Sequence, residues 1–86
     1  MWHVYVIQSE TKGVLYTGIT KDLERRLREH NTSQTRSARY TRTGGRRPWK
    51  LVHLEGPFDL PDALRRERVI KKMTRIRKLD LIQASR

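Results

Sequence analysis

Two short segments at the start of the chain are rich in β-branched and aromatic residues. Trp2 to Ile7 and Val14 to Ile19 have this composition, and the polar stretch between them ends in Gly13. These are the signals of two strands joined by a turn. We therefore predict an antiparallel hairpin in which each strand carries one tyrosine, Tyr5 in the first and Tyr16 in the second.

The pattern changes to helical spacing after the hairpin. Thr20 can serve as the N-cap of a helix that ends near His30-Asn31, with Leu23 and Leu27 four residues apart on its buried side. At 100° per residue, Arg26 and His30 fall within about 60° of those leucines. An arginine so placed either pairs with a carboxylate or lines a pocket that receives an anion, and the pattern leaves both open.

Residues 31–47 hold five arginines among Ser, Thr and a Gly pair, with no acid. This composition predicts an exposed basic loop, with one helical turn at about residues 37–40. Its cations are suited to phosphates, and its tyrosine to stacking on an unpaired base. The candidate nucleic-acid contacts are Arg36, Arg39, Tyr40, Arg42, Arg46 and Arg47.

The second half begins with a predicted strand, Trp49 to Glu55, which Gly56-Pro57 should end. Asp59 is then expected to cap a helix that starts near Leu60-Pro61 and runs to about Thr74. Residues 75–83 form a further helix or continue the same one.

The buried side of that helix should carry Ala63, Val69, Ile70 and Met73, with Glu67 at its margin. One interpretation of Glu67 is a surface ion pair with the lysine four residues later. The other is a metal ligand.

Length and charge narrow the function. Eighty-six residues suit one domain, 1–86, and 35% of them are hydrophobic, which predicts a thin core. Twenty Lys and Arg against nine acids give a net charge of +11, and fourteen of the twenty are Arg, whose planar fork matches phosphate oxygens. Nucleic acid is the expected partner, DNA first and RNA as a possibility. An anionic membrane is the weaker candidate, because no lipidation motif or strongly amphipathic helix accompanies the charge.

Other classes are disfavoured by what the sequence lacks. With no Cys, there are no disulfides, thiolate zinc sites or Cys nucleophiles, so any metal needs oxygen or imidazole ligands and Mg²⁺ or Mn²⁺ is favoured. The N-terminus shows no signal-peptide pattern, and we expect a cytoplasmic protein, favoured as a monomer. A nuclease needs a cation for the phosphate, a metal near the leaving oxygen and a group that acts on water. The set Tyr5, Tyr16, Arg26, His30 and Glu67 supplies these types.

The order of these residues resembles the GIY-YIG endonuclease family. His3-Val4-Tyr5 and Tyr16-Thr17-Gly18 look like its paired tripeptides, and Arg26, ten residues after Tyr16, looks like its catalytic arginine. His30 one turn later and Glu67 in the later helix also resemble family positions. The absence of an appended domain, with Leu15 to Thr20 and Ala38-Arg39-Tyr40-Thr41, resembles the small URI-type branch.

The resemblance implies an α+β fold, a three-stranded antiparallel sheet flanked by helices in the order β-β-α-loop-β-α-α. It also implies an endonuclease with one divalent ion on Glu67. The chain departs from the family at His3 and Val4 of the first tripeptide, in having no lysine after Gly18, and in having no late Asn, where Gln83 is a doubtful substitute.

The mechanism that follows is hydrolysis of a DNA phosphodiester by in-line attack of water, on single-stranded or branched substrates in preference to plain duplex. Arg26 would neutralise the phosphate, and Tyr5 or Tyr16 would orient or deprotonate the water, with a pKa lowered from about 10 by nearby cations. His30 would position water or phosphate, or make a structural hydrogen bond. The alternative is a non-catalytic nucleic-acid-binding module on the same fold.

Overall fold

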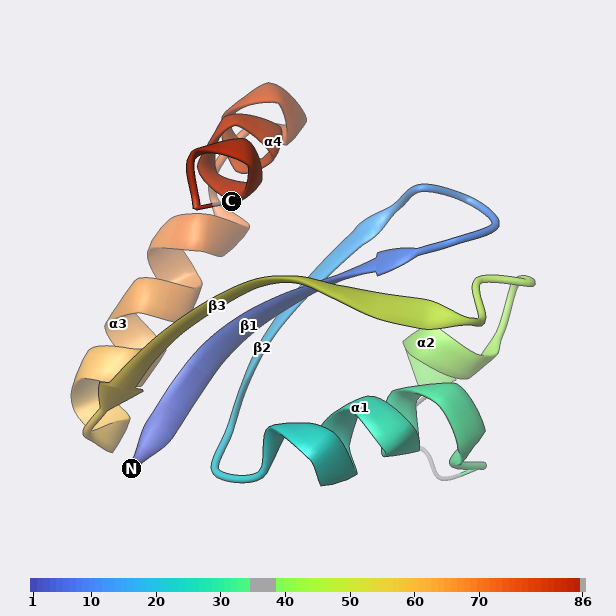
Figure 1. The fold of residues 1–86 in the computed structure, drawn as a ribbon, viewed down its shortest axis with the longest axis horizontal. Coiled ribbons are helices and arrows are strands. Elements are labelled where there is room, and N and C mark those ends of the chain that lie inside the picture. Colours follow the sequence, from blue (N-terminus) through green and yellow to red (C-terminus); the bar gives the residue numbers. More distant parts are fainter. Residues whose placement is uncertain (35–38, 86) are drawn as a thin grey trace.

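A computed structural model describes residues 1–34 and 39–85, so the candidate contact Arg36 lies outside the described residues. Within these described residues, three strands and four helices follow one another (Figure 1). The predicted β-β-α-loop-β-α-α order is confirmed, and the loop contains a helical turn, as expected, at Arg39–Arg42. The elements are β1 (Trp2–Ser9), β2 (Leu15–Thr20), α1 (Leu23–Thr32), α2 (Arg39–Arg42), β3 (Trp49–Phe58), α3 (Leu60–Lys71) and α4 (Arg75–Ala84).

The strands form one antiparallel sheet, as the resemblance implied, and their order in it is β2-β1-β3. In the β1-β2 hairpin, Tyr5 is opposite Gly18 and Ile7 is opposite Tyr16. Because directly paired residues, and residues two apart on one strand, point to the same face, these four side chains share one face of the sheet. The two tyrosines are therefore diagonal neighbours.

Helices cover both faces of the sheet (Figure 1). On one face, Val4 and Val6 pack with Ala63 and Ile70 of α3 and with Ile82 of α4. On the other face, Tyr5, Ile7 and Trp49 pack with side chains from β2 and α1. The thin core expected from the composition is thus divided into two layers. None of the helices in residues 1–34 and 39–85 is long and apolar enough to cross a membrane.

Two predicted boundaries were wrong. The N-cap of α1 is Asp22, whose carboxylate accepts the amide of Arg25 at 3.1 Å, while Thr20 is the last residue of β2. The third strand continues through Gly56-Pro57 to Phe58. A Cβ at residue 56 would lie 2.9 Å from the Trp2 carbonyl oxygen, so glycine permits the close approach of the two strands instead of ending one.

The predicted Asp59 cap is confirmed, since its carboxylate accepts the amide of Asp62 at 2.9 Å. α3 ends at Lys71, and α4 starts afresh after its own N-cap, Thr74. Val69 was wrongly placed on the buried side of α3, because its side chain is half exposed. The apolar stripe of α3 is narrower than the sequence suggested.

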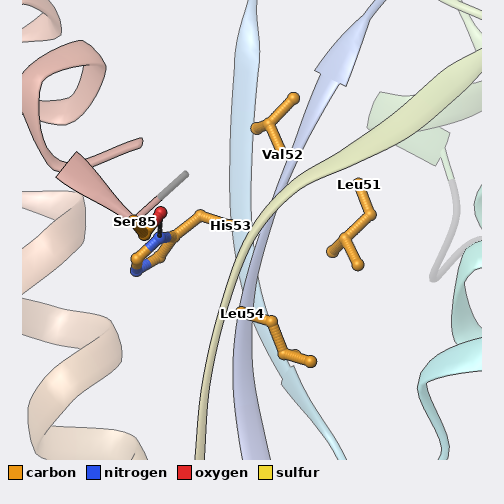
Figure 2. Close-up of a pocket in the computed structure, with 5 residues that line it drawn as sticks. All are labelled: Leu51, Val52, His53, Leu54 and Ser85. Carbon is orange, nitrogen blue, oxygen red and sulfur yellow. Dashed lines mark hydrogen bonds between the residues drawn. The ribbon is translucent and has the colours of Figure 1, made fainter. Parts of the chain in front are cut away.

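A polar cluster ties β3 to both C-terminal helices. Each ring nitrogen of His53 makes a hydrogen bond. Nε2 lies 2.6 Å from Glu55 Oε2, and Nδ1 lies 3.0 Å from Ser85 Oγ. Arg66 of α3 donates to both oxygens of Glu55, at 2.6 and 3.0 Å. Figure 2 shows His53 extending from β3 toward Ser85, while Leu54 points to the other side of the strand.

Candidate active site

Tyr5 is at the centre of the site, on the sheet face that α1 covers. Its side chain is buried, and its hydroxyl lies 2.8 Å from Nε2 of His30. The positive charge of the Arg26 guanidinium acts on the same phenol and opposes the effect of burial on its pKa. A Cβ at Gly18 would lie 2.5 Å from that oxygen, so the glycine opposite Tyr5 provides the space for its ring to lie across β2. Glycine at the third position of the second tripeptide therefore has a steric explanation, because a side chain there would collide with Tyr5.

His30 is the most deeply buried polar group of the site. Nε2 faces the Tyr5 hydroxyl, and Nδ1 lies 3.0 Å from Oγ1 of Thr41 on α2. Burial, helped by the neighbouring Arg26, lowers the pKa of His30 to about 4. The ring is therefore neutral near pH 7, and one of its nitrogens must accept a hydrogen bond while the other donates one.

The structure corrects the expectation of a lowered pKa for Tyr5. Burial raises the pKa of its phenol to about 12, and the lowering effect of Arg26 is too small to compensate. Tyr5 is consequently a neutral phenol over the physiological range. It is placed to hold Arg26 and not to take a proton from water.

Arg26 has the carboxylate neighbour that one interpretation of the helical wheel required, but the contact to Glu29 Oε1 is long, at 3.4 Å. Its charge also acts on the phenol of Tyr5. The side chain is 23% exposed, so it is in part open to solvent. The other interpretation, a pocket that receives an anion, stays a prediction.

Tyr16 has an environment unlike that of Tyr5. It is only partly buried, and its ring meets the His30 ring edge-on at a centroid distance of 5.1 Å. Tyr40 stacks on it at 5.7 Å. Within residues 1–34 and 39–85, its hydroxyl makes no hydrogen bond. The phenol oxygen of Tyr16 is thus available to a water or a substrate.

Glu67 reaches the same region from α3. Its side chain is 18% exposed and pairs with Lys71 at 3.3 Å, the ion pair considered from the sequence. It is also close enough to Tyr5 that its negative charge helps to raise the phenol pKa. Within residues 1–34 and 39–85, no group of three or more His, Asp or Glu side chains is placed so that it could hold a metal.

Comparison with known proteins tests the resemblance. The sequence model of the GIY-YIG catalytic domain matches residues 1–80. The chain belongs to the GIY-YIG family. The fold and family expected from the sequence are thus shown, while the roles of Tyr5, Tyr16, Arg26, His30 and Glu67 stay predictions.

Relatives of similar size support this assignment to the GIY-YIG family. A UPF0213 protein of Desulfotalea psychrophila is 46% identical over 98% of this chain and 73% of its own length. Another, of Syntrophus aciditrophicus, is 48% identical over 94% of this chain and 88% of its own. The solution structure of a UPF0213 protein from Bacillus halodurans is 29% identical and superposes with a TM-score of 0.59, covering 98% of this chain and 85% of the other.

The arginines of the basic loop divide into two groups in this GIY-YIG domain. Arg47 donates to the carbonyls of His30 and Ser33, at 2.7 and 2.5 Å, and so satisfies the end of α1. Arg46 donates to the Thr43 carbonyl at 2.8 Å and lies over the Tyr40 ring, 4.2 Å from its centroid. Both candidate DNA contacts thus have structural partners. By contrast, Arg39 is exposed.

Sequence reasoning missed the residues that support His30. Thr41 was only part of a recognised stretch and was given no role, yet it is buried against the imidazole. Trp49 donates from its indole nitrogen to the Thr41 carbonyl at 2.7 Å, and the amide of Asn31 clamps the Trp49 backbone. In the sequence these residues are only a Thr and a Trp in a basic segment. Nothing in that pattern indicates that the Thr contacts a histidine 11 residues earlier.

Proposed function

We propose that this GIY-YIG domain is a metal-dependent endonuclease that hydrolyses phosphodiester bonds in DNA. The observation that supports this function is the arrangement around Tyr5. The partly exposed Arg26 and the carboxylate of Glu67 both act on its phenol, and Tyr16, a tyrosine in a different environment, is its diagonal neighbour in the sheet. Each is a type of group that phosphodiester hydrolysis requires.

Arg26 binds and neutralises the scissile phosphate. Its attachment to Tyr5 fixes the guanidinium before the substrate arrives, so little reorganisation is needed in the transition state. The weak contact with Glu29 leaves the cation without a close carboxylate that would compete with the phosphate. Tyr5 and His30 act through Arg26: both are buried, and they hold the cation in position.

Tyr16 acts on the attacking water. Its hydroxyl accepts a hydrogen bond from the attacking water and orients it. As the water oxygen bonds to phosphorus, the water's proton passes to solvent, while the bond to the 3′ oxygen breaks and that oxygen takes a proton from solvent water. Tyr5 is the poorer candidate for this step, because its pKa is about 12 and its oxygen already serves Arg26 and His30. The choice between the two tyrosines, open from the sequence, favours Tyr16.

A single divalent ion fits the donor set. Mg²⁺ commonly takes one or two carboxylates and completes its shell with waters and substrate phosphate oxygens. Glu67 is partly exposed, and Lys71 is its ion-pair partner, so its carboxylate can serve a cation without breaking a buried network. Bound there, Mg²⁺ or Mn²⁺ would supply positive charge for the leaving 3′ oxygen.

The loop supplies the grip on DNA. Arg39 and Arg42 are the proposed phosphate contacts of α2, while Arg46 and Arg47 contribute charge from positions fixed by backbone carbonyls. Tyr40 is 45% exposed beside Tyr16, where an unpaired base could stack. Single-stranded and branched DNA are thus favoured over plain duplex.

Cleavage of end-labelled single-stranded, duplex, flap and four-way-junction DNA with Mg²⁺ or Mn²⁺ tests the function. Arg26→Ala and Glu67→Ala should each reduce the cleavage rate by about 100-fold or more without loss of folding. Arg25→Ala and Glu24→Ala, exposed neighbours on α1, are the matched controls and should cut normally. Binding without cutting on every substrate would instead support a non-catalytic nucleic-acid-binding module.

A further inference from the structure

We infer that Thr41 is a positioning residue, whose hydroxyl accepts the Nδ1 proton of His30 and thereby selects the tautomer that presents an unprotonated Nε2 to Tyr5. This inference rests on the proposed function for its catalytic consequence, but not for its structural content. It assigns a role to α2, an element outside the recognised tripeptides.

The hydrogen-bond accounting begins with the charge beside Tyr5. The positive charge of Arg26 acts on the phenol, and because a guanidinium can only donate, the phenol oxygen directs a lone pair and not its proton toward it. The Tyr5 proton is then directed to its other partner, Nε2 of His30 at 2.8 Å. With Nε2 as acceptor, a neutral imidazole carries its proton on Nδ1, and the atom within reach of that proton is Oγ1 of Thr41 at 3.0 Å.

Burial makes the choice of tautomer consequential. His30 and Thr41 are 0% and 1% exposed, so water cannot replace either partner. A ring with the proton on Nε2 would point an N–H at Tyr5 and turn the phenol proton toward the guanidinium, which is also a donor. That arrangement would weaken the attachment of Arg26 to Tyr5.

The position of Thr41 is itself fixed. Its carbonyl accepts the indole N–H of Trp49 at 2.7 Å, and the backbone of Trp49 is held on both sides by Asn31, with contacts of 2.6 and 3.1 Å. A chain of contacts therefore runs from β3 through α2 to His30, Tyr5 and Arg26. These contacts give α2 a role beyond presenting arginines to DNA.

Long-range ¹H–¹⁵N NMR of the imidazole rings near pH 7 tests the tautomer directly. The wild type should show a protonated Nδ1 and an unprotonated Nε2 for His30. Thr41→Val, similar in shape but without an acceptor, should shift His30 toward the other tautomer, and Thr41→Ser should restore the original signals. Thr32→Val removes a hydroxyl from an exposed threonine at the end of α1 and should leave the His30 signals unchanged.

Activity provides the second readout. Thr41→Val should lower kcat by about tenfold, the equivalent of one hydrogen bond, with KM little changed and with recovery in Thr41→Ser. A protonated Nε2 in the wild type, or an unchanged tautomer in Thr41→Val, would overturn the inference. Should Thr41→Val not fold, Thr41→Ala and the wild-type spectrum decide the question. A protein that cuts no DNA but shows these tautomers would refute the endonuclease and not the role of Thr41 in selecting the tautomer.

Discussion

Two buried histidines on opposite faces of the sheet bridge polar partners in different ways. His30 connects Tyr5 to α2 beside the guanidinium of Arg26, whose carboxylate contact is long. His53 contacts a carboxylate, Glu55, that is also held by an arginine through two short hydrogen bonds. Charges are matched on the α3 face, as structural stability requires. On the α1 face a cation is held beside a neutral ring, which favours the arrival of an anion.

The largest predicted effect is a pH dependence of the free energy of unfolding, which differs between the two faces of the sheet. Because the pKa of His30 falls from 6.5 to about 4 on folding, the unfolded chain binds the extra proton between these values. The free energy of unfolding should therefore decrease as pH is lowered from about 6.5 to about 4, by about 3 kcal/mol in total. Urea unfolding at a series of pH values measures this slope.

His30→Gln is the control for that slope, since a variant with no titrating group at residue 30 should lose most of the dependence in this range. Arg66 lowers the pKa of Glu55 below its usual 4.5. The stabilisation that Glu55 gives the folded state is therefore complete above that pH and is lost only at more acidic pH. If the free energy of unfolding of His30→Gln still changed with pH between 6.5 and 4.5, the conclusion that His30 is buried and neutral would be wrong.

The next effect breaks the cluster on the α3 face. Glu55→Gln removes the charge that faces Arg66 and His53, and it should destabilise the fold by about 2 kcal/mol, as expected for lost hydrogen bonds to charged groups. Urea unfolding at pH 7 measures the loss. The folded fraction should still cleave DNA at the wild-type rate, because Glu55 contacts His53 and Arg66 and neither is a proposed catalytic residue. Lost cleavage in a fully folded Glu55→Gln protein would show that this cluster also supports the site, for instance by holding α3 and its Glu67.

The sequence predicted the elements because local signals specify them. Asp59 was identified as a cap, and the hairpin was identified from two β-rich runs around a polar turn. The path of the chain at Gly56-Pro57 was missed, because the approach of Trp2 that permits a continuous strand is a tertiary contact. Local composition carries no information about which strand lies alongside.

The chemistry of the candidate site also depends on tertiary contacts that local sequence does not reveal. The resemblance selected Arg26 and Glu67, whose charges both act on the phenol of Tyr5, but the sequence did not predict the direction of the Tyr5 pKa. Composition suggested many cations around the phenol, whereas the balance between burial and one guanidinium decides the result. Likewise, the structural use of Arg46 and Arg47 depends on carbonyls at helix ends, which no charge pattern reveals.

A third prediction compares the two faces at adjacent residues of β2. Gly18→Ala would place a Cβ 2.5 Å from the Tyr5 oxygen, and the ring cannot swing away because both Arg26 and His30 hold it. We expect a destabilisation of about 1 kcal/mol, at the low end for overpacking because β2 is an edge strand, with a large loss of cleavage. Parallel urea unfolding and cleavage assays would separate the two effects.

Thr17→Val is the matched control for Gly18→Ala. Thr17 points to the α3 face, and within the described chain its buried Oγ1 has no hydrogen-bond partner. Replacing that hydroxyl with a methyl group should leave stability unchanged or increase it by about 1 kcal/mol, with normal cleavage. If both variants cut DNA normally, the space over Gly18 would have no catalytic importance.

The smallest predicted effect concerns the outer partner of each histidine. Ser85→Ala removes the hydroxyl that faces Nδ1 of His53, but Ser85 lies in the partly exposed last turn after α4, where water can replace it. The global free energy of unfolding should change by only about 0.5 kcal/mol, while the α4 amides exchange hydrogen faster because the helix end is less firmly held. Thr41→Val, the corresponding change on the other face, should alter the tautomer of His30 and the cleavage rate, since no water reaches that bond. Unchanged α4 exchange in Ser85→Ala would mean that the α3-face cluster holds β3 to α3 alone, through Glu55 and Arg66.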